Sequence, residues 1–187
     1  MMTPARSSPE PRSRIPDLLL AFLLVAPAMG CAATSQVACA LIDEPQGEIE
    51  RCARVTADGT WRVSPEVLAR LHFDRDGLAG VVVDGFAYVR RDGRALGVAT
   101  MDNGPDYFSE GLVRFRQGAH LGYADRRLKV VIPAQYDGAL PFHHGRASVC
   151  IGCRTVRVGE HSEYQGGRNL CLDHRGARHP LAECASH

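Results

Sequence analysis

Three glycine-centred tripeptides recur at a fixed interval along the chain. Gly77-Leu78-Ala79, Gly111-Leu112-Val113 and Gly145-Arg146-Ala147 stand 34 residues apart. A phenylalanine precedes each of them, at Phe73, Phe108 and Phe142. A fixed period of this length indicates tandem structural repeats, because each unit must bury its apolar face against a neighbour. The repeat therefore constrains the fold more than any other feature of the sequence.

Each unit carries two runs of strand-forming residues separated by turn residues. The first run follows the glycine, and a second lies at 85–89, 121–125 and 169–173. Short alternating apolar and polar runs bounded by glycine are typical of β-hairpins. One hairpin cannot bury its apolar face alone. The sequence thus predicts a mainly all-β fold of stacked hairpins.

The middle unit resembles the WG repeat. The matching residues are Leu121-Gly122-Tyr123-Ala124-Asp125, Val131-Ile132-Pro133, Tyr136-Asp137, Phe142 and Gly145-Arg146-Ala147. The family pattern reads roughly W-G-Y-I-D, G-K-x-V-I-P, Y-D-x-A and F-x-x-G-L-A. Leu121 stands in place of its tryptophan and Leu128 in place of its turn glycine. The resemblance covers roughly residues 73–181 and implies a β-hairpin array with an interaction role and no catalytic residues.

The predicted domain organisation has three parts. Residues 1–30 form a signal segment, and residues 31–72 form an N-terminal cap with a short helix near 64–71. Three WG-like repeats follow, at about 73–107, 108–141 and 142–184. Within the cap, Ser64 is a suitable N-cap residue and Pro65 suits the first helical position.

The first 30 residues have the layout of an export signal. Arginines precede the apolar run Leu18–Ala26, and the small residues Ala28 and Gly30 lead directly into Cys31. The run is shorter than the roughly 20 residues that cross a bilayer. The segment ending at Cys31 resembles a bacterial lipobox, with alanine in place of the usual leucine. We expect a periplasmic or outer-membrane lipoprotein with lipid on Cys31; a freely secreted product and an uncleaved anchor are the alternatives.

The charge balance bears on the class of partner. Three of the 22 basic and two of the 21 acidic residues lie in residues 1–30, which leaves 19 of each. Nucleic-acid binding needs a dense basic face, which a balanced chain does not favour. We expect an envelope protein or a cell-wall component as partner, and membrane contact only through the signal segment or a lipid on Cys31.

Six further cysteines are disulfide candidates: Cys39, Cys52, Cys150, Cys153, Cys171 and Cys184. An even number in an exported chain favours disulfide bonds. Cys39 and Cys52 lie close together and far from the others, so we expect them to pair. The remaining four then share two bridges, whose connectivity the sequence leaves open.

Cys150-Ile151-Gly152-Cys153 also allows a different chemistry. A CxxC pair is half of a zinc ribbon, and His143 and His161 lie nearby in sequence. Cys171 and Cys184 do not form the second CxxC that such a site needs. A metal-binding or redox-linked envelope protein is therefore the alternative function, and the leading interpretation requires no metal or cofactor.

Three polar clusters have both a functional and a structural interpretation. The segment 102–106 suits a calcium loop or an Asn-Gly turn. His143-His144 suits a metal pair or an exposed turn, and Glu160-His161 suits a catalytic dyad or a hairpin loop. We favour the structural interpretation of each, because the segment 102–106 offers too few ligands for calcium and the other two clusters lie where a turn and a loop are expected. The predicted function is a non-enzymatic interaction module.

Overall fold

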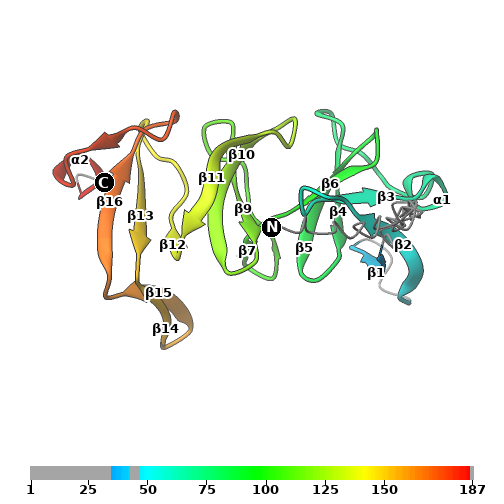
Figure 1. Ribbon diagram of the computed structural model, residues 1–187, viewed down its shortest axis with the longest axis horizontal. Coiled ribbons are helices and arrows are strands. Elements are labelled where there is room, and N and C mark those ends of the chain that lie inside the picture. Colours follow the sequence, from blue (N-terminus) through cyan, green and yellow to red (C-terminus); the bar gives the residue numbers. More distant parts are fainter. Residues whose placement is uncertain (1–34, 43–46, 186–187) are drawn as a thin grey trace, which may run out of the picture. The chain divides into compact units, whose positions relative to one another are not determined.

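The computed structural model describes residues 35–42 and 47–185 (Figure 1). The chain divides into two units: Met1–Ala32, which lies outside the described residues, and Ala33–His187, which holds all of them. The first nine strands are β1 (Gln36–Leu41), β2 (Ile49–Val55), β3 (Trp61–Val63), β4 (Leu78–Val82), β5 (Phe86–Arg90), β6 (Arg94–Gly97), β7 (Thr100–Met101), β8 (Gly104–Pro105) and β9 (Leu112–Gln117). The others are β10 (His120–Asp125), β11 (Val130–Tyr136), β12 (Gly138–Ala139), β13 (Ala147–Ile151), β14 (Arg154–Val158), β15 (His161–Gln165), β16 (Arg168–Leu172) and β17 (Arg178–His179).

The first predicted repeat shares a sheet with the segment that precedes it. Strands β1-β2-β3-β6-β5-β4 form a closed barrel, in which β1 pairs with β4. Its core is built mainly from small and β-branched side chains, and the disulfide between Cys39 and Cys52 lies within it. The segment expected to cap the array therefore contributes three strands to this barrel.

The second repeat forms the three-stranded sheet β11-β10-β9. Gly122, the glycine of the W-G position, lies where β11 approaches closely. A Cβ atom there would be 2.4 Å from the carbonyl oxygen of Ile132 and 2.6 Å from the Phe115 ring. The β10–β11 register also shifts beside Tyr123. Glycine at this position thus permits the close approach.

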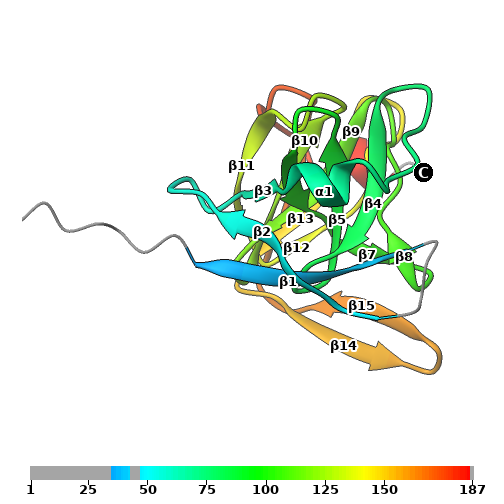
Figure 2. The ribbon, with the colours of Figure 1, turned by 90° about the vertical axis from the view of Figure 1, so that its right-hand side faces the viewer.

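The third repeat contributes β13, β16 and β17 to a four-stranded sheet, β12-β13-β16-β17, whose strand β12 comes from the end of the second repeat. The third repeat also carries an additional hairpin, β14-β15. Figures 1 and 2 show this hairpin extending from the ends of β13 and β16. Most of its side chains are exposed. An isolated two-stranded hairpin is marginally stable in water, so its attachment at the base contributes to its order. There Cys150 is bonded to Cys153, and Asp137 Oδ2 accepts the Gly152 N–H at 2.6 Å.

Alternate side chains of the second repeat pack into two different cores. In β9, Val113 and Phe115 join Leu78 of the barrel, whereas Leu112 faces the third sheet. In β10, Ala124 packs with Val113 and Phe115, whereas Tyr123 belongs to the same core as Leu112. This alternation, which the pleat of a strand dictates, gives the second repeat one face toward the first repeat and one toward the third.

The prediction of a mainly β fold is confirmed, and the two described helices are one turn each. α1 (Pro65–Leu68) begins after Ser64, whose Oγ accepts the Val67 N–H at 3.4 Å. Val67 is buried in the barrel core. α2 (Ala182–Ala185) was not expected from the sequence. Within residues 35–42 and 47–185, no helix has the length and apolar character needed to cross a membrane.

Candidate functional site

The same tyrosine contact joins each repeat to the next. Tyr88 packs on Phe108 with ring centroids 5.4 Å apart, and its hydroxyl donates to the Asp106 carbonyl at 2.9 Å. Tyr123 packs on Phe142 at 4.8 Å, and its hydroxyl donates to the Leu140 carbonyl at 2.6 Å. In both cases the accepting carbonyl lies two residues before the phenylalanine. The repeats are thus joined by one contact used twice.

A second recurring contact places a cationic or imidazole group over each repeat phenylalanine. Arg91 lies over Phe73 and Arg126 over Phe108, each at 4.6 Å from the ring centroid. His174 occupies the equivalent position in the third repeat and stacks on Phe142 at 4.5 Å. Guanidinium and aromatic faces attract each other electrostatically.

Two of these stacked groups also reach an acidic residue of the preceding repeat. Arg126 contacts Asp76 at 2.5 Å, and His174 Nε2 lies 2.8 Å from Glu110 Oε2. Asp76 and Glu110 each precede a glycine of the 34-residue period. Burial raises the pKa of Glu110, but the Gly145 N–H and His174 outweigh that effect and leave this pKa below its ordinary value.

The third repeat departs from this pattern on its outward face, where no further repeat follows among the described residues. The positions of Leu112, Leu121 and Tyr123 are taken there by Arg146, Asn169 and Cys171. Apolar and aromatic groups that would contact a next repeat are thus replaced by polar groups and a cysteine. These replacements are those expected of a terminal repeat, which needs an outer face that tolerates water.

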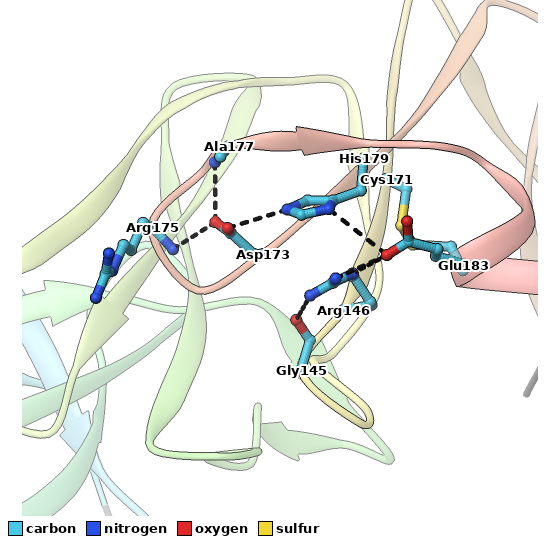
Figure 3. Close-up of polar contacts among 9 residues, drawn as sticks. Gly145, Arg146, Cys171, Asp173, Arg175, Ala177, His179 and Glu183 are labelled. Carbon is cyan, nitrogen blue, oxygen red and sulfur yellow. Dashed lines mark hydrogen bonds and ion pairs between the residues drawn. A yellow bond between two sulfur atoms is a disulfide. The ribbon is translucent and has the colours of Figure 1, made fainter.

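The C-terminal segment is fastened to this outward face. Cys171 is bonded to Cys184 of α2, and Arg146 NH2 contacts Glu183 Oε2 at 2.7 Å. Figure 3 shows the polar chain that continues from there: His179 lies between Glu183, at 3.5 Å, and Asp173, at 3.0 Å. The contact with His179 and the N–H groups of Ala177 and Arg175 lower the pKa of Asp173 to about 2. The network attaches the segment after β17 to the third repeat.

A cleft of about 580 Å³ opens on the same face. Its lining residues are Gly138, Leu140, Ser148, Val149, Cys150, Ser162, Glu163, Tyr164, Asn169, Leu181 and Cys184. Leu140 and Leu181 keep 48% and 51% of their surface exposed, and Glu163 is the charged member of the lining. A second hollow of about 340 Å³ shares Leu140, Ser148 and Cys184 with it. Mostly apolar clefts with a few polar groups are typical of binding sites.

The inserted hairpin forms one wall of the cleft. Tyr164 of β15 lies against Gly138, where a Cβ atom would be 2.6 Å from both the Tyr164 ring and Cys150 Sγ. Glycine at 138 therefore lets the tyrosine and the disulfide pack closely beside the sheet. Ser162 and Glu163, also of β15, complete this wall, and Leu181 lies in the lining ahead of α2. The site combines a sheet face, a hairpin and the C-terminal segment.

Disulfide bonds, predicted from the six cysteines, are present in the described structure. Cys39 is joined to Cys52, Cys150 to Cys153, and Cys171 to Cys184. Only the first of these pairings was specific in the sequence prediction. The other two settle the connectivity that the sequence left open. Cys31 lies outside the described residues.

The residues of the alternative metal site are not brought together. Cys150 and Cys153 are bonded to each other, whereas zinc binds cysteine as free thiolate. His143 lies in the turn before β13 and His161 begins β15. No group of three or more histidine, cysteine or acidic side chains in the described ranges is arranged to hold a metal ion.

The three polar clusters take different roles. The acidic end of the segment 102–106 is Asp106, which is 1% exposed and forms a two-point contact with Arg114. The sequence did not suggest that Asp106 would pair with Arg114. His143-His144 lies at a tight turn closed by two backbone hydrogen bonds between His143 and Arg146. Glu160 and His161 lie at the tip of the β14-β15 hairpin, where both are exposed.

Leu140, Glu163, Tyr164 and Leu181 were not among the predicted site residues. For Glu163 and Tyr164 a signal existed in the sequence: both lie in the added length of the third repeat, which has no counterpart in the first two. An insertion into a repeat array generally falls on one face and often forms its binding face. That signal could have directed attention to residues 154–165.

Comparison with known proteins places one segment of the chain in a family. The model of the WG containing repeat matches residues 122–152, which run from β10 to the end of β13 and cross the boundary between the second and third repeats. No curated protein and no solved structure matches the chain. The match and the repeated contacts described above agree with the motifs of the middle unit, and the segment 122–152 is a WG containing repeat.

Proposed function

We propose that this chain is an exported, non-enzymatic interaction module that binds a protein of the bacterial cell envelope through the cleft on its third repeat. The observation that carries the proposal is the cleft itself, whose two leucines are each about half exposed. Large contiguous apolar patches are uncommon on the surface of monomeric proteins and mark interaction sites. The repeat array serves as a rigid support for it.

The cysteines support export. All six cysteines between residues 35 and 185 are joined in three disulfide bonds. Disulfides persist in oxidising compartments such as the bacterial periplasm and are rare in the reducing cytosol. Together with the signal-like residues 1–30 and the lipobox-like segment at Cys31, they favour an envelope location with a lipid anchor on Cys31.

Affinity capture with the exported chain tests the binding role. The wild-type protein is used to capture partners from solubilised envelopes, beside Leu140→Arg and the control Val131→Arg. Val131 is 38% exposed on β11 and lies outside the cleft. We expect one protein partner that wild type and Val131→Arg retain and Leu140→Arg loses. Equal capture by all three variants, or retention only of isolated cell-wall material, would contradict the proposal.

Metabolic labelling with a radioactive fatty acid tests the anchor. We expect label in the wild-type chain and none in Cys31→Ala, with the variant moving to the soluble envelope fraction. Cys39→Ala is the control, because Cys39 is bonded to Cys52 and should not affect lipid attachment. Equal labelling of wild type and Cys31→Ala would exclude Cys31 as the attachment site.

A further inference from the structure

Within the part of the chain that the structure describes, one strand edge beside the cleft has no partner strand. β15 pairs with β14 alone, in a two-stranded sheet of its own. Three residues of β15 line the cleft, whereas no residue of β14 does. Figure 2 agrees, with β15 on the side of the hairpin toward β12 and β14 on the outer side. The edge of β15 that does not pair with β14 therefore borders the cleft.

An unpaired strand edge is chemically specific. It presents main-chain N–H and C=O groups in the spacing that another strand requires, and it readily accepts a strand from a second chain. Neighbouring strands lie about 4.8 Å apart. A strand added to β15 would therefore lie over the cleft, and alternate side chains of that strand would point into it.

The side chains around the edge indicate what such a strand should carry. The cleft offers Leu140, Leu181 and the Tyr164 ring to an apolar group. Glu163, at the centre of β15, is exposed and supplies the charge of the lining. A basic side chain opposite Glu163 would be favoured, since opposite charges across a strand pair are stabilising and like charges are not.

The same charge disfavours a second copy of this chain. An antiparallel pairing of β15 with itself, centred on Glu163, would place two glutamates directly opposite each other. A like-charge pair across strands is destabilising. The charge of the edge therefore selects a peptide of different sequence.

We propose that the outer edge of β15 binds an extended peptide segment of the partner as a third strand of the β14-β15 sheet. One apolar side chain of the segment enters the cleft beside Leu140 and Leu181, and a neighbouring basic side chain pairs with Glu163. This rests on the proposed interaction function and states the chemistry of its partner. Binding through the main chain provides affinity, and the two side-chain positions provide selectivity.

The test begins with a phage library of random nine-residue peptides, selected on the full-length exported protein with its disulfides formed. We expect enrichment of peptides with an apolar residue and a lysine or arginine next to it or two residues away. The affinity of one synthetic enriched peptide is then measured by calorimetry. The backbone nitrogens of that peptide are then methylated in two alternate sets, one set per peptide. Methylation of one set should weaken binding on the order of tenfold, because those amides donate to β15, and methylation of the other set should have no such effect.

Charge exchange tests the second part of the proposal. Glu163→Arg should weaken the lysine-containing peptide by about tenfold, and replacing that lysine with glutamate should restore affinity for the variant. Glu160→Arg is the matched control, because Glu160 is exposed in the hairpin turn outside the cleft and should change affinity less than about twofold.

Three results would overturn the inference. The first is that no peptide is enriched. The second is that methylation of neither set of nitrogens changes the affinity. The third is that the protein forms a concentration-dependent dimer, which the enriched peptide dissociates. A different result would contradict the proposed function itself: envelope capture that yields no partner whose binding is lost in Leu140→Arg. If capture succeeds but is unaffected by both Glu163→Arg and the enriched peptide, the function stands and the strand-addition mechanism does not.

Discussion

At the scale of single residues, the most constrained polar group is the buried pair of Arg114 and Asp106. Their side chains are 7% and 1% exposed, and a third guanidinium nitrogen donates to the Ala139 carbonyl at 3.0 Å. The pair thus connects the loop after the barrel, the second sheet and the third sheet. A buried ion pair whose remaining donors are satisfied avoids the large cost of an uncompensated buried charge.

Arg114→Met should destabilise the protein by about 3–5 kcal/mol, because it leaves Asp106 buried without its counter-charge. Arg116→Met is the control on the same strand: Arg116 is exposed, and its change should stay within about 0.5 kcal/mol. Urea denaturation measures both. The double variant Arg114→Met with Asp106→Leu should recover much of the loss. A single-variant cost no larger than that of the control would show that the pair is not needed for stability.

The pKa of Asp173 gives a prediction for acid conditions. The folded value of about 2 lies below the ordinary value of 3.8, chiefly because of the hydrogen bond with His179. The stabilisation that Asp173 provides is therefore complete above pH 3.8 and is lost as the pH falls toward 2. Carboxyl NMR titration should find a pKa near 2 in wild type and a rise toward 3.8 in His179→Ala. His161→Ala, on the distant hairpin, should leave it unchanged; an unshifted Asp173 in wild type would contradict the assignment.

Sequence patterns predicted individual residues unevenly. Ser64 was predicted as a helix cap because capping depends on neighbours within one turn. The partnership of Arg114 with Asp106 was not predicted, because it depends on burial between three separate segments. Leu128 is another case: it occupies the turn position of the family glycine with φ of 55°, and its side chain is fully buried. Its apolar packing compensates for a backbone conformation that leucine rarely adopts.

At the scale of elements, the hairpins followed from local alternation and turn residues, whereas their grouping into sheets did not. The barrel arises because β1–β3, which lie outside the repeat, pair with β6 and β4 of the first repeat. No periodicity marks those strands. The β14-β15 hairpin was hidden in the same way, since the sequence presented it only as a longer third repeat with Glu160-His161 in a loop.

The disulfide of the barrel and that of the C-terminal segment form a natural comparison. Cys39–Cys52 and Cys171–Cys184 each close 13 residues, so their effects on the unfolded chain should be similar. Replacing either pair by alanine should cost about 2–4 kcal/mol. Hydrogen exchange should rise in β1 and β2 for the first variant and in β17 and the C-terminal segment for the second. Unchanged exchange after loss of Cys171–Cys184 would show that this bond does not hold the C-terminal segment.

At the scale of the whole described molecule, the same tyrosine–phenylalanine contact joins the first repeat to the second and the second to the third, and the third repeat lacks that tyrosine. Tyr88 and Tyr123 each reach the phenylalanine of the next repeat, and Cys171 stands at their position in the last one. A repeat protein needs a terminal unit whose outer face tolerates water. Here the terminal face also carries the cleft, so the end of the array and the proposed binding site coincide. The sequence predicted the array. It did not predict the cleft, because the cleft depends on where α2 and the inserted hairpin lie in the folded structure.

Photo-cross-linking in living cells tests the central claim most directly. A photoreactive phenylalanine analogue is placed at Leu181, which lines the cleft, and separately at Tyr107, which is 64% exposed and lies outside it. After irradiation, we predict one discrete protein adduct from position 181 that an excess of a cleft-binding peptide abolishes, and no such adduct from position 107. Adducts of equal yield at both positions, or none at 181 in cells that export the protein, would contradict the account.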